Sequence, residues 1–190
     1  PNFGSEEWNP VALNYCCTTP MPTNGVGNIT LDPQLASDSH LSVDSPCRGA
    51  GSAAYVSGTD IDGEPWATQP SIGCDEYHAG DVTGPLQVAI SVDYTNVAVG
   101  FAVNFTAQIA GRTVASVWDF GDGTVVSNRP YATHAWGEGG DYVVVLRVYN
   151  ESYPAGVSAA VAVHVLAPAV YYVAADSADP VFPYTSWATA

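Results

Sequence analysis

The chain is 190 residues long and has a formal net charge of −15, from 19 acidic residues against 4 basic ones, all of which are arginines. Four arginines cannot form a basic patch, which excludes binding to nucleic-acid phosphates and attraction to an anionic membrane surface. Hydrophobic residues make up 47 % of the chain, so it is expected to fold around a core. No apolar run reaches the roughly 20 residues of a membrane span.

The first part of the chain, residues 1–84, is irregular and rich in turns, with short apolar runs at 11–13, 28–31 and 40–43. It also holds all four cysteines. The absence of a C-x-x-C pair argues against zinc, and an even number of cysteines in an acidic, lysine-free chain favours disulfides. A bridge between neighbours would be strained, so two pairings remain open for the candidates Cys16, Cys17, Cys47 and Cys74.

Residues 85–166 contain longer runs in which apolar and polar side chains alternate, as in half-buried antiparallel strands. The run from Tyr142 to Tyr149 places Tyr142, Val144, Leu146 and Val148 on one face. Similar runs start near Phe101 and Val114. Such spacing without helical signals predicts a small β-sandwich, with Trp118 as a core anchor and Tyr142 in a tyrosine-corner contact.

Three motifs in this part follow one another in a familiar order. They are V-W-D-F-G-D-G-T at 117–124, Y-A-T-H-A-W at 131–136 and G-D-Y-V-V-V-L at 140–146. Together they resemble the PKD domain, with Trp136 where that family usually has tyrosine. The resemblance implies an immunoglobulin-like sandwich from an extracellular, multidomain protein, where such domains serve as spacers, adhesive modules or substrate-disrupting modules.

The first part carries a second resemblance, at 27–35, 41–51, 59–63 and 72–77. Its G-N-I-x-x-D-P, S-P-x-x-x-A-G and D-x-D-G stretches are similar to the C-terminal end of right-handed parallel β-helix proteins of bacterial surfaces. Gly49 replaces a usual aspartate and Trp66 a frequent arginine, so any salt bridge of those relatives is lost here. The resemblance implies that residues 1–84 are the last coils of a β-helix.

The tail, residues 167–190, begins with an apolar run at 170–173 and ends in T-S-W-A-T-A. It resembles a linker and the first strand of another β-helix. The fold class expected for the whole chain is therefore all-β: the end of a parallel β-helix, a PKD sandwich, and the start of a following β-helix. Such a chain would be a window from a longer alternating array.

Acidic pairs flank two glycine turns, Asp60 with Asp62 and Asp119 with Asp122. Carboxylates on a turn can bind Ca²⁺, but neither stretch has EF-hand spacing, and aspartates commonly cap turns by accepting backbone N–H bonds. The sequence therefore predicts no metal ligands and no cofactor-binding residues, with Ca²⁺ as the one cofactor left open.

Catalytic constellations are missing from the sequence. Asp75 and Glu76 are neighbours that should point to opposite faces of a strand, which spoils the carboxylate spacing of a glycosidase. A lyase acting on uronates needs cations, which are scarce here. No G-x-S-x-G elbow or phosphate loop occurs, and His134 matches a structural histidine of the PKD motif. We expect no catalytic residues and no enzyme activity.

Aromatic residues gather where two modules should meet. They are expected to seal the boundary between those modules, although exposed rings could also stack on sugars. These residues are Tyr149, Tyr153, Tyr171, Tyr172, Phe182, Tyr184 and Trp187. The sequence thus predicts a non-catalytic structural segment of a bacterial extracellular or cell-surface repeat protein, forming a stalk, fibre or filament. Its partners would be other copies or adjacent modules. The alternative is an adhesin or carbohydrate-binding accessory region that contacts extracellular polysaccharide.

Overall fold

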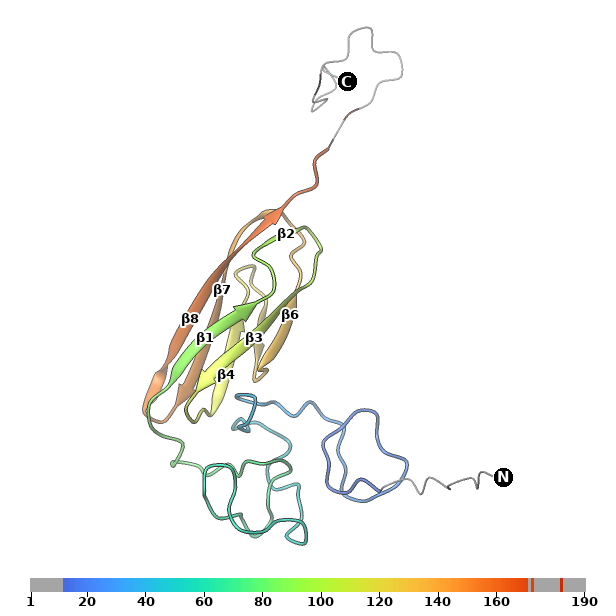
Figure 1. Cartoon of the computed structure of the whole chain (residues 1–190), viewed down its shortest axis with the longest axis vertical. Helices are drawn as coiled ribbons and strands as arrows, with labels where there is room; N and C mark the ends of the chain where they lie inside the picture. Colours follow the sequence, from blue (N-terminus) through green and yellow to red (C-terminus); the bar gives the residue numbers. More distant parts are fainter. Residues whose placement is uncertain (1–11, 171, 173–181, 183–190) are drawn as a thin grey trace, which may run out of the picture.

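The computed structural model describes residues 12–170, 172 and 182. These residues form no helix, and all their strands lie between Gln87 and Leu166 (Figure 1). The strands are β1 (Gln87–Val92), β2 (Asn96–Ala98), β3 (Val103–Ala110), β4 (Ala115–Asp119), β5 (Val125–Ser127), β6 (Tyr131–His134), β7 (Gly140–Asn150) and β8 (Tyr153–Leu166).

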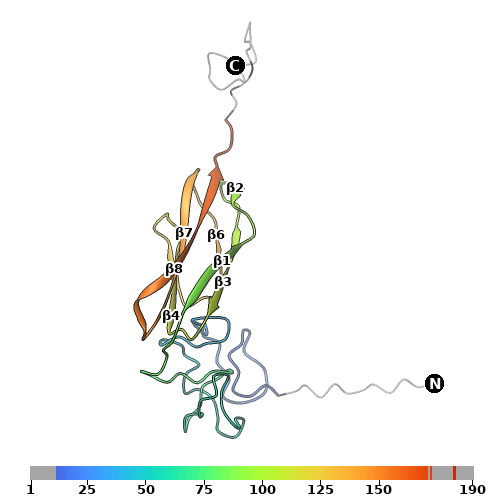
Figure 2. The same ribbon diagram turned by 60° about the vertical axis from the view of Figure 1, so that its left-hand side comes forward.

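The strands form two sheets that face each other as a β-sandwich (Figures 1 and 2). One sheet has the order β1-β3-β6 and the other β2-β8-β7-β4-β5. All pairs are antiparallel except β2 with β8. The β-sandwich predicted from the alternating runs is therefore confirmed. One detail of the prediction was wrong: Phe101 precedes β3 and is 46 % exposed, because the buried alternation starts only at Val103.

The core between the sheets is built around four aromatic rings that are at most 1 % exposed: Phe105, Trp118, Phe120 and Trp136. Both indole N–H groups are satisfied, since Trp118 donates to the carbonyl of Arg129 at 2.8 Å and Trp136 to that of Phe120 at 3.1 Å. Trp118 is thus the core anchor predicted from the sequence. Tryptophan rings can be buried at this depth because their indole N–H groups find hydrogen-bond acceptors.

Tyr142 stands where β7 begins and makes the predicted corner contact. Its ring stacks on Trp136 at a centroid distance of 5.3 Å, and its hydroxyl donates to the carbonyl of Glu138 at 3.1 Å. The alternation along β7 is also as predicted, because Val144, Leu146 and Val148 are fully buried while Arg147 is exposed.

The N-terminal segment, defined here as residues 12–84, contains no strand. Its ladder contacts are the isolated bridges Cys17–Ile29 (parallel), Leu35–Leu41 and Thr59–Pro65 (both antiparallel). A small apolar cluster of Leu41, Cys47 and Ile72 forms its centre. The described residues therefore form irregular turns in place of regular β-helix coils, and the β-helix assignment of residues 1–84 stays a prediction. Coils of a β-helix pair their backbone groups with neighbouring coils, so coils without such neighbours are not expected to form regular strands.

The chain enters and leaves the sandwich at opposite ends (Figures 1 and 2). Gly84, just before β1, accepts a hydrogen bond from Asn150 at the last residue of β7. The end of β8 lies beside the first residue of β7, where Val165 pairs with Gly140. The 11 residues of β7 separate these points by about 35 Å.

The predicted start of a following β-helix falls almost entirely outside the described residues. Within residues 167–170, which are described, there is no strand, and Val170 is 63 % exposed. Residues 171, 173–181 and 183–190, including Tyr171, Tyr184 and Trp187, are not among those the structure describes.

Candidate functional site at the junction of the two parts

A tight turn of the N-terminal segment presents two carboxylates toward the sandwich. Asp60, only 8 % exposed, organises this turn: its Oδ1 accepts the N–H groups of Asp62 at 3.0 Å and Glu64 at 2.7 Å. Its Oδ2 accepts the N–H of Glu76 at 3.1 Å. Both carboxylate oxygens of Asp60 thus accept backbone N–H groups. Asp62 and Glu64 are the two acids of the turn that face the sandwich.

Arg112 of the sandwich inserts between these two acids. Its Nη2 donates to Glu64 Oε2 at 2.6 Å, and its Nε lies 2.8 Å from Asp62 Oδ2 in an ion pair that lacks hydrogen-bond geometry. Its Nη1 donates to the carbonyl of Asp81 at 3.1 Å. Arg112 stands on the turn between β3 and β4, where Gly111 has φ +99° and a Cβ would overlap the carbonyl oxygen of Pro85. Only glycine allows this close approach.

The acids hold the guanidinium in its charged form. Partial burial acts to lower the pKa of Arg112, but Glu64 and Asp62 outweigh it and raise that pKa above its ordinary value. Because its side chain is 23 % exposed, this pair is shielded from water better than most surface ion pairs, whose contribution is about 0–1 kcal/mol.

Further links join the N-terminal segment to the sandwich. The N–H of Val43 donates to the carbonyl of Val114 at 3.0 Å, and Arg129 forms an ion pair with Asp32. With the Arg112 pairs, these contacts make up what we call the junction. Each of them connects residues far apart in the sequence, so no local motif could have predicted them.

Two groups of potential metal ligands lie around the same turn: His40, Asp62 and Asp75, and Asp60, Glu64 and His78, with donor atoms within 4.8 Å of one another in each group. Arg112 already contacts one carboxylate of each group, Asp62 and Glu64. A cationic side chain therefore already pairs with one carboxylate of each group. The Asp60–Asp62 turn is therefore part of the junction between the N-terminal segment and the sandwich.

The adjacent acids Asp75 and Glu76 have structural partners. Asp75, 4 % exposed, accepts the N–H of Leu41 at 2.8 Å, and Glu76, 5 % exposed, accepts the N–H and the hydroxyl of Ser71 at 2.8 and 3.0 Å. Burial raises the pKa of Asp75 above its ordinary value, against the Leu41 hydrogen bond, which lowers it. Both acids fix loops of the N-terminal segment instead of facing a common substrate position.

The second acidic pair caps the turn of the W-D-F-G-D-G motif. Asp119 Oδ1 accepts the N–H of Gly121 and Asp122 Oδ1 that of Thr124, both at 2.9 Å. His134 Nε2 lies 2.7 Å from Asp122 Oδ2, and its ring stacks on Phe120 at 4.3 Å. The turn-capping interpretation of this pair and the structural assignment of His134 are therefore confirmed.

All four cysteines are free thiols in the structure, so the disulfides expected from the sequence are not formed there. Cys47 is buried and Cys17 packs against the same cluster. Cys16 Sγ donates to the carbonyl of Asn14 at 3.3 Å, and Cys74 Sγ to that of Ser39 at 3.6 Å.

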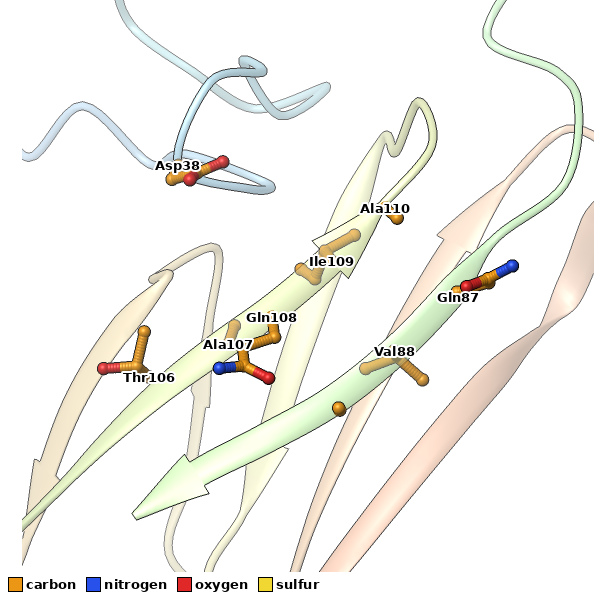
Figure 3. Close-up of a pocket in the computed structure, with 9 residues that line it drawn as sticks. Asp38, Gln87, Val88, Thr106, Ala107, Gln108, Ile109 and Ala110 are labelled. Atoms are coloured by element: carbon orange, nitrogen blue, oxygen red, sulfur yellow. The ribbon is translucent and has the colours of Figure 1, made fainter. Parts of the chain in front are cut away.

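An open hollow of about 520 Å³ lies between Asp38 of the N-terminal segment and strands β1 and β3 (Figure 3). Among the described residues that line it, Asp38 is the only ionisable one; the others include Gln87, Thr106 and Gln108. One carboxylate alone does not provide the acid–base pair of a glycosidase.

A second hollow, of about 390 Å³, is lined by Tyr94, Phe101 and Asn96 near β2. The two rings meet edge to face at 5.6 Å, and both are exposed, by 55 % and 46 %. Sequence analysis missed this pair because Phe101 was placed on a buried strand.

Among the described residues, no helix is long and apolar enough to cross a bilayer.

Comparison with known proteins places the sandwich in a family. Residues 86–163 match the family model of the PKD domain. The solved PKD domain of the human VPS10 domain-containing receptor SorCS2 is 21 % identical, at a TM-score of 0.36, over 55 % of this chain and 99 % of that one. A structure from work on the promiscuous specificity of carbohydrate-binding modules of the β-sandwich superfamily is 20 % identical, at a TM-score of 0.42, over 51 % of this chain and 39 % of that one. No curated protein matches the sequence.

Proposed function

We propose that this chain, in which residues 86–163 are a PKD domain, is a non-catalytic structural segment of a large extracellular modular protein. The PKD domain acts as a spacer in a stalk, fibre or filament on a bacterial surface. Its partners are the adjacent modules or other copies of the protein. No turnover on uronate polymers is expected from it.

The observation that carries this proposal is the path of the chain through the sandwich. The chain enters beside the Asn150 end of β7 and leaves beside its Gly140 end. A domain built in this way adds its full length, about 35 Å along β7, between the modules on either side. Domains whose two ends lie close together add little length.

The junction adds stiffness to this spacer. Arg112, the Val43–Val114 hydrogen bond and the Arg129–Asp32 ion pair contact three separate loops of the N-terminal segment. Attachment at several points restrains rotation about the linker at residues 82–86. A stalk that must hold its end at a distance benefits from such restraint.

Residual dipolar couplings of the 190-residue chain test the restraint. The N-terminal segment and the sandwich should share one alignment tensor in the unaltered chain. Arg112→Met should reduce the order of the N-terminal segment relative to the sandwich, whereas Arg147→Met should not, because Arg147 bonds Ser158 within the sandwich, between β7 and β8. Two independent tensors in the unaltered chain would contradict the rigid spacer.

A second candidate function is carbohydrate binding, as in an adhesin or an accessory region of a polysaccharide-degrading protein. The exposed pair of Tyr94 and Phe101, with the Asn96 amide beside it, supports this candidate. Aromatic faces stack on sugar rings, and amides donate to and accept from sugar hydroxyls. A ligand of this kind must be neutral or cationic, given a net charge of −15.

Titration with neutral oligosaccharides, followed by amide chemical shifts, tests this candidate. Shifts should gather around residues 94–101 and disappear in Tyr94→Ala. Tyr131→Ala is the matched control, because Tyr131 is 65 % exposed on β6, away from the hollow. Binding that survives Tyr94→Ala and is lost in Tyr153→Ala would place the sugar at the end of the sandwich beside Gly84.

A further inference from the structure

We propose that Cys17 and Cys47 are a modification site, oxidised to a disulfide that closes a loop of about 30 residues in the N-terminal segment. This inference goes beyond the proposed function and does not depend on it. It selects one cross-link from the alternatives that the sequence leaves open.

The two cysteines pack in the same apolar cluster. Cys47 is 2 % exposed and packs with Leu41 and Ile72, and Cys17 lies against this group. Burial, and after it the neighbouring Cys17 thiol, raises the pKa of Cys47. A disulfide requires the two sulfurs to reach bonding distance, and rotation of side chains that pack in one cluster can bring them there.

Both backbones are held in place around the contact. Cys17 forms a parallel bridge with Ile29. The carbonyl of Cys47 accepts the N–H of Ile72 at 2.8 Å, and its N–H donates to the Ser45 hydroxyl at 3.2 Å. The two cysteines are therefore positioned by independent contacts and not by the thiols alone.

Cys17 Sγ donates to the carbonyl of Leu31 at 3.2 Å and must leave it to bond Cys47. Unlike Cys17, the other two cysteines do not pack against the cluster of Cys47. The thiol of Cys16 points to the carbonyl of Asn14, and that of Cys74 to the carbonyl of Ser39. Cys16 cannot reach Cys47 while Cys17 does, because neighbouring side chains in an extended chain point in opposite directions. The proposed pairing is therefore Cys17 with Cys47, and Cys16 and Cys74 remain thiols.

The oxidant is a disulfide donor, such as an oxidised dithiol protein or oxidised glutathione. The Cys17 thiolate attacks one donor sulfur, forms a mixed disulfide and releases the other donor sulfur as a thiolate. The Cys47 thiolate then attacks the Cys17 sulfur and releases the second donor thiolate. In total the two cysteines lose two protons, and two electrons pass to the donor.

This order follows from the surroundings of each thiol. Burial, followed by the neighbouring Cys17, raises the pKa of Cys47 to about 11. Its thiolate is scarce at neutral pH, so it is a poor first nucleophile, and the closing step should accelerate as the pH rises. Cys17 is the more exposed of the two and should meet the donor first.

Peptide mapping of the full 190-residue chain tests the proposal. The chain is equilibrated with oxidised and reduced glutathione, its free thiols are alkylated in denaturant, and it is cleaved before aspartates. This cleavage places Cys16 and Cys17 in residues 1–31, Cys47 in 44–59 and Cys74 in 62–74. We expect residues 1–31 joined to 44–59, with Cys74 alkylated.

Two matched variants identify the partner within the first peptide. The cross-link should persist in Cys16→Ser and vanish in Cys17→Ser. Oxidation should also raise the denaturant midpoint of the N-terminal segment in Cys16→Ser but not in Cys17→Ser. Four alkylated thiols in the unaltered chain, a link from 62–74, or a link that survives Cys17→Ser would overturn the proposal. The map of the unaltered chain gives its answer even if a variant fails to fold.

Discussion

At the scale of single residues, the W-D-F-G-D-G motif is a turn held by its own side chains. Asp119 and Asp122 accept backbone N–H groups inside the turn, and Gly121 brings the backbone against β7. The sequence was enough to predict this turn, because every contact within it spans only a few residues. The bond between Asp122 and His134 crosses 12 residues; the family resemblance gave His134 a structural role but did not name this partner.

The two glycines of the turn should respond differently to substitution. Gly121 has φ +78°, and a Cβ there would lie 2.9 Å from the carbonyl oxygen of Val143; Gly123 has φ +91° and nothing within 4 Å. Gly123→Ala should cost about 1 kcal/mol of unfolding free energy, from backbone strain alone. Gly121→Ala should cost about 2–3 kcal/mol, because the clash adds to the strain. Equal costs in urea titrations would argue against the close approach to β7.

Asp122 should give the sandwich an acid-sensitive contribution to stability. Although partial burial acts to raise its pKa, the Thr124 N–H and His134 lower it below the ordinary value. Since the folded pKa is the lower one, the contribution is complete above the ordinary aspartate pKa and is lost as the pH falls through the folded pKa. Asp122→Asn keeps the cap but removes the charge, so it should be less stable than the unaltered chain by about 1 kcal/mol at neutral pH.

That difference should close in acid, as followed by urea unfolding at several pH values. Asp119→Asn is the control, because it removes a carboxylate from the same turn and leaves the partner of His134 intact. A gap between Asp122→Asn and the unaltered chain that stays constant down to acid pH would contradict the role of the charge.

At the scale of elements, the strands of the sandwich could be predicted and the contacts of the N-terminal segment could not. Alternation along β3, β4 and β7 identified their buried faces, because a strand with one face in the core repeats every two residues. The PKD assignment made from these runs and their motifs is confirmed for residues 86–163. The N-terminal segment offered no such period, and its carboxylates have distant partners: Asp75 bonds Leu41, 34 residues away, and Asp32 pairs with Arg129, 97 residues away.

Asn150 shows how one side chain can join three elements. It is 2 % exposed; its Nδ2 donates to the carbonyls of Gly84 and Arg112, and its Oδ1 accepts the N–H groups of Ser152 and Tyr153. Asn150→Asp should destabilise the sandwich by about 2–4 kcal/mol, because a carboxylate would face two carbonyls. Asn96→Asp, at an exposed site on β2, is the control for the chemical change itself.

Thermal unfolding of the two variants measures this difference. Asn150 also begins an N-x-S sequon, but its amide is buried and fully bonded, so the folded domain cannot accept a glycan there. Equal melting temperatures for Asn150→Asp and Asn96→Asp would show that the Asn150 contacts add nothing to stability.

At the scale of the whole molecule, two unequal cores share one acidic chain. The sandwich core contains 14 buried hydrophobic residues, and the cluster of the N-terminal segment contains three. Seven polar or charged residues are buried in that segment, among them Asp60, Asp75 and Glu76. Since burial of apolar area is the main source of stability, the two parts should open independently, with the N-terminal segment opening first.

Hydrogen exchange of the isolated chain should reveal this division. Amides of β3, β7 and β8 should exchange only through global unfolding, while those of the N-terminal segment exchange through local opening. The amide of Ile29, bonded to the carbonyl of Cys16 at 2.9 Å, is the informative one, because it reports the single parallel bridge. If residues 1–84 are the last coils of a β-helix, that bridge lacks the preceding coils that would support it, so it should open readily in the isolated chain. A longer piece of the parent protein that supplies those coils should protect Ile29 while leaving β7 unchanged. Strong protection of Ile29 in a chain that light scattering shows to be monomeric would mean that the N-terminal segment is complete by itself, and the β-helix prediction would fail.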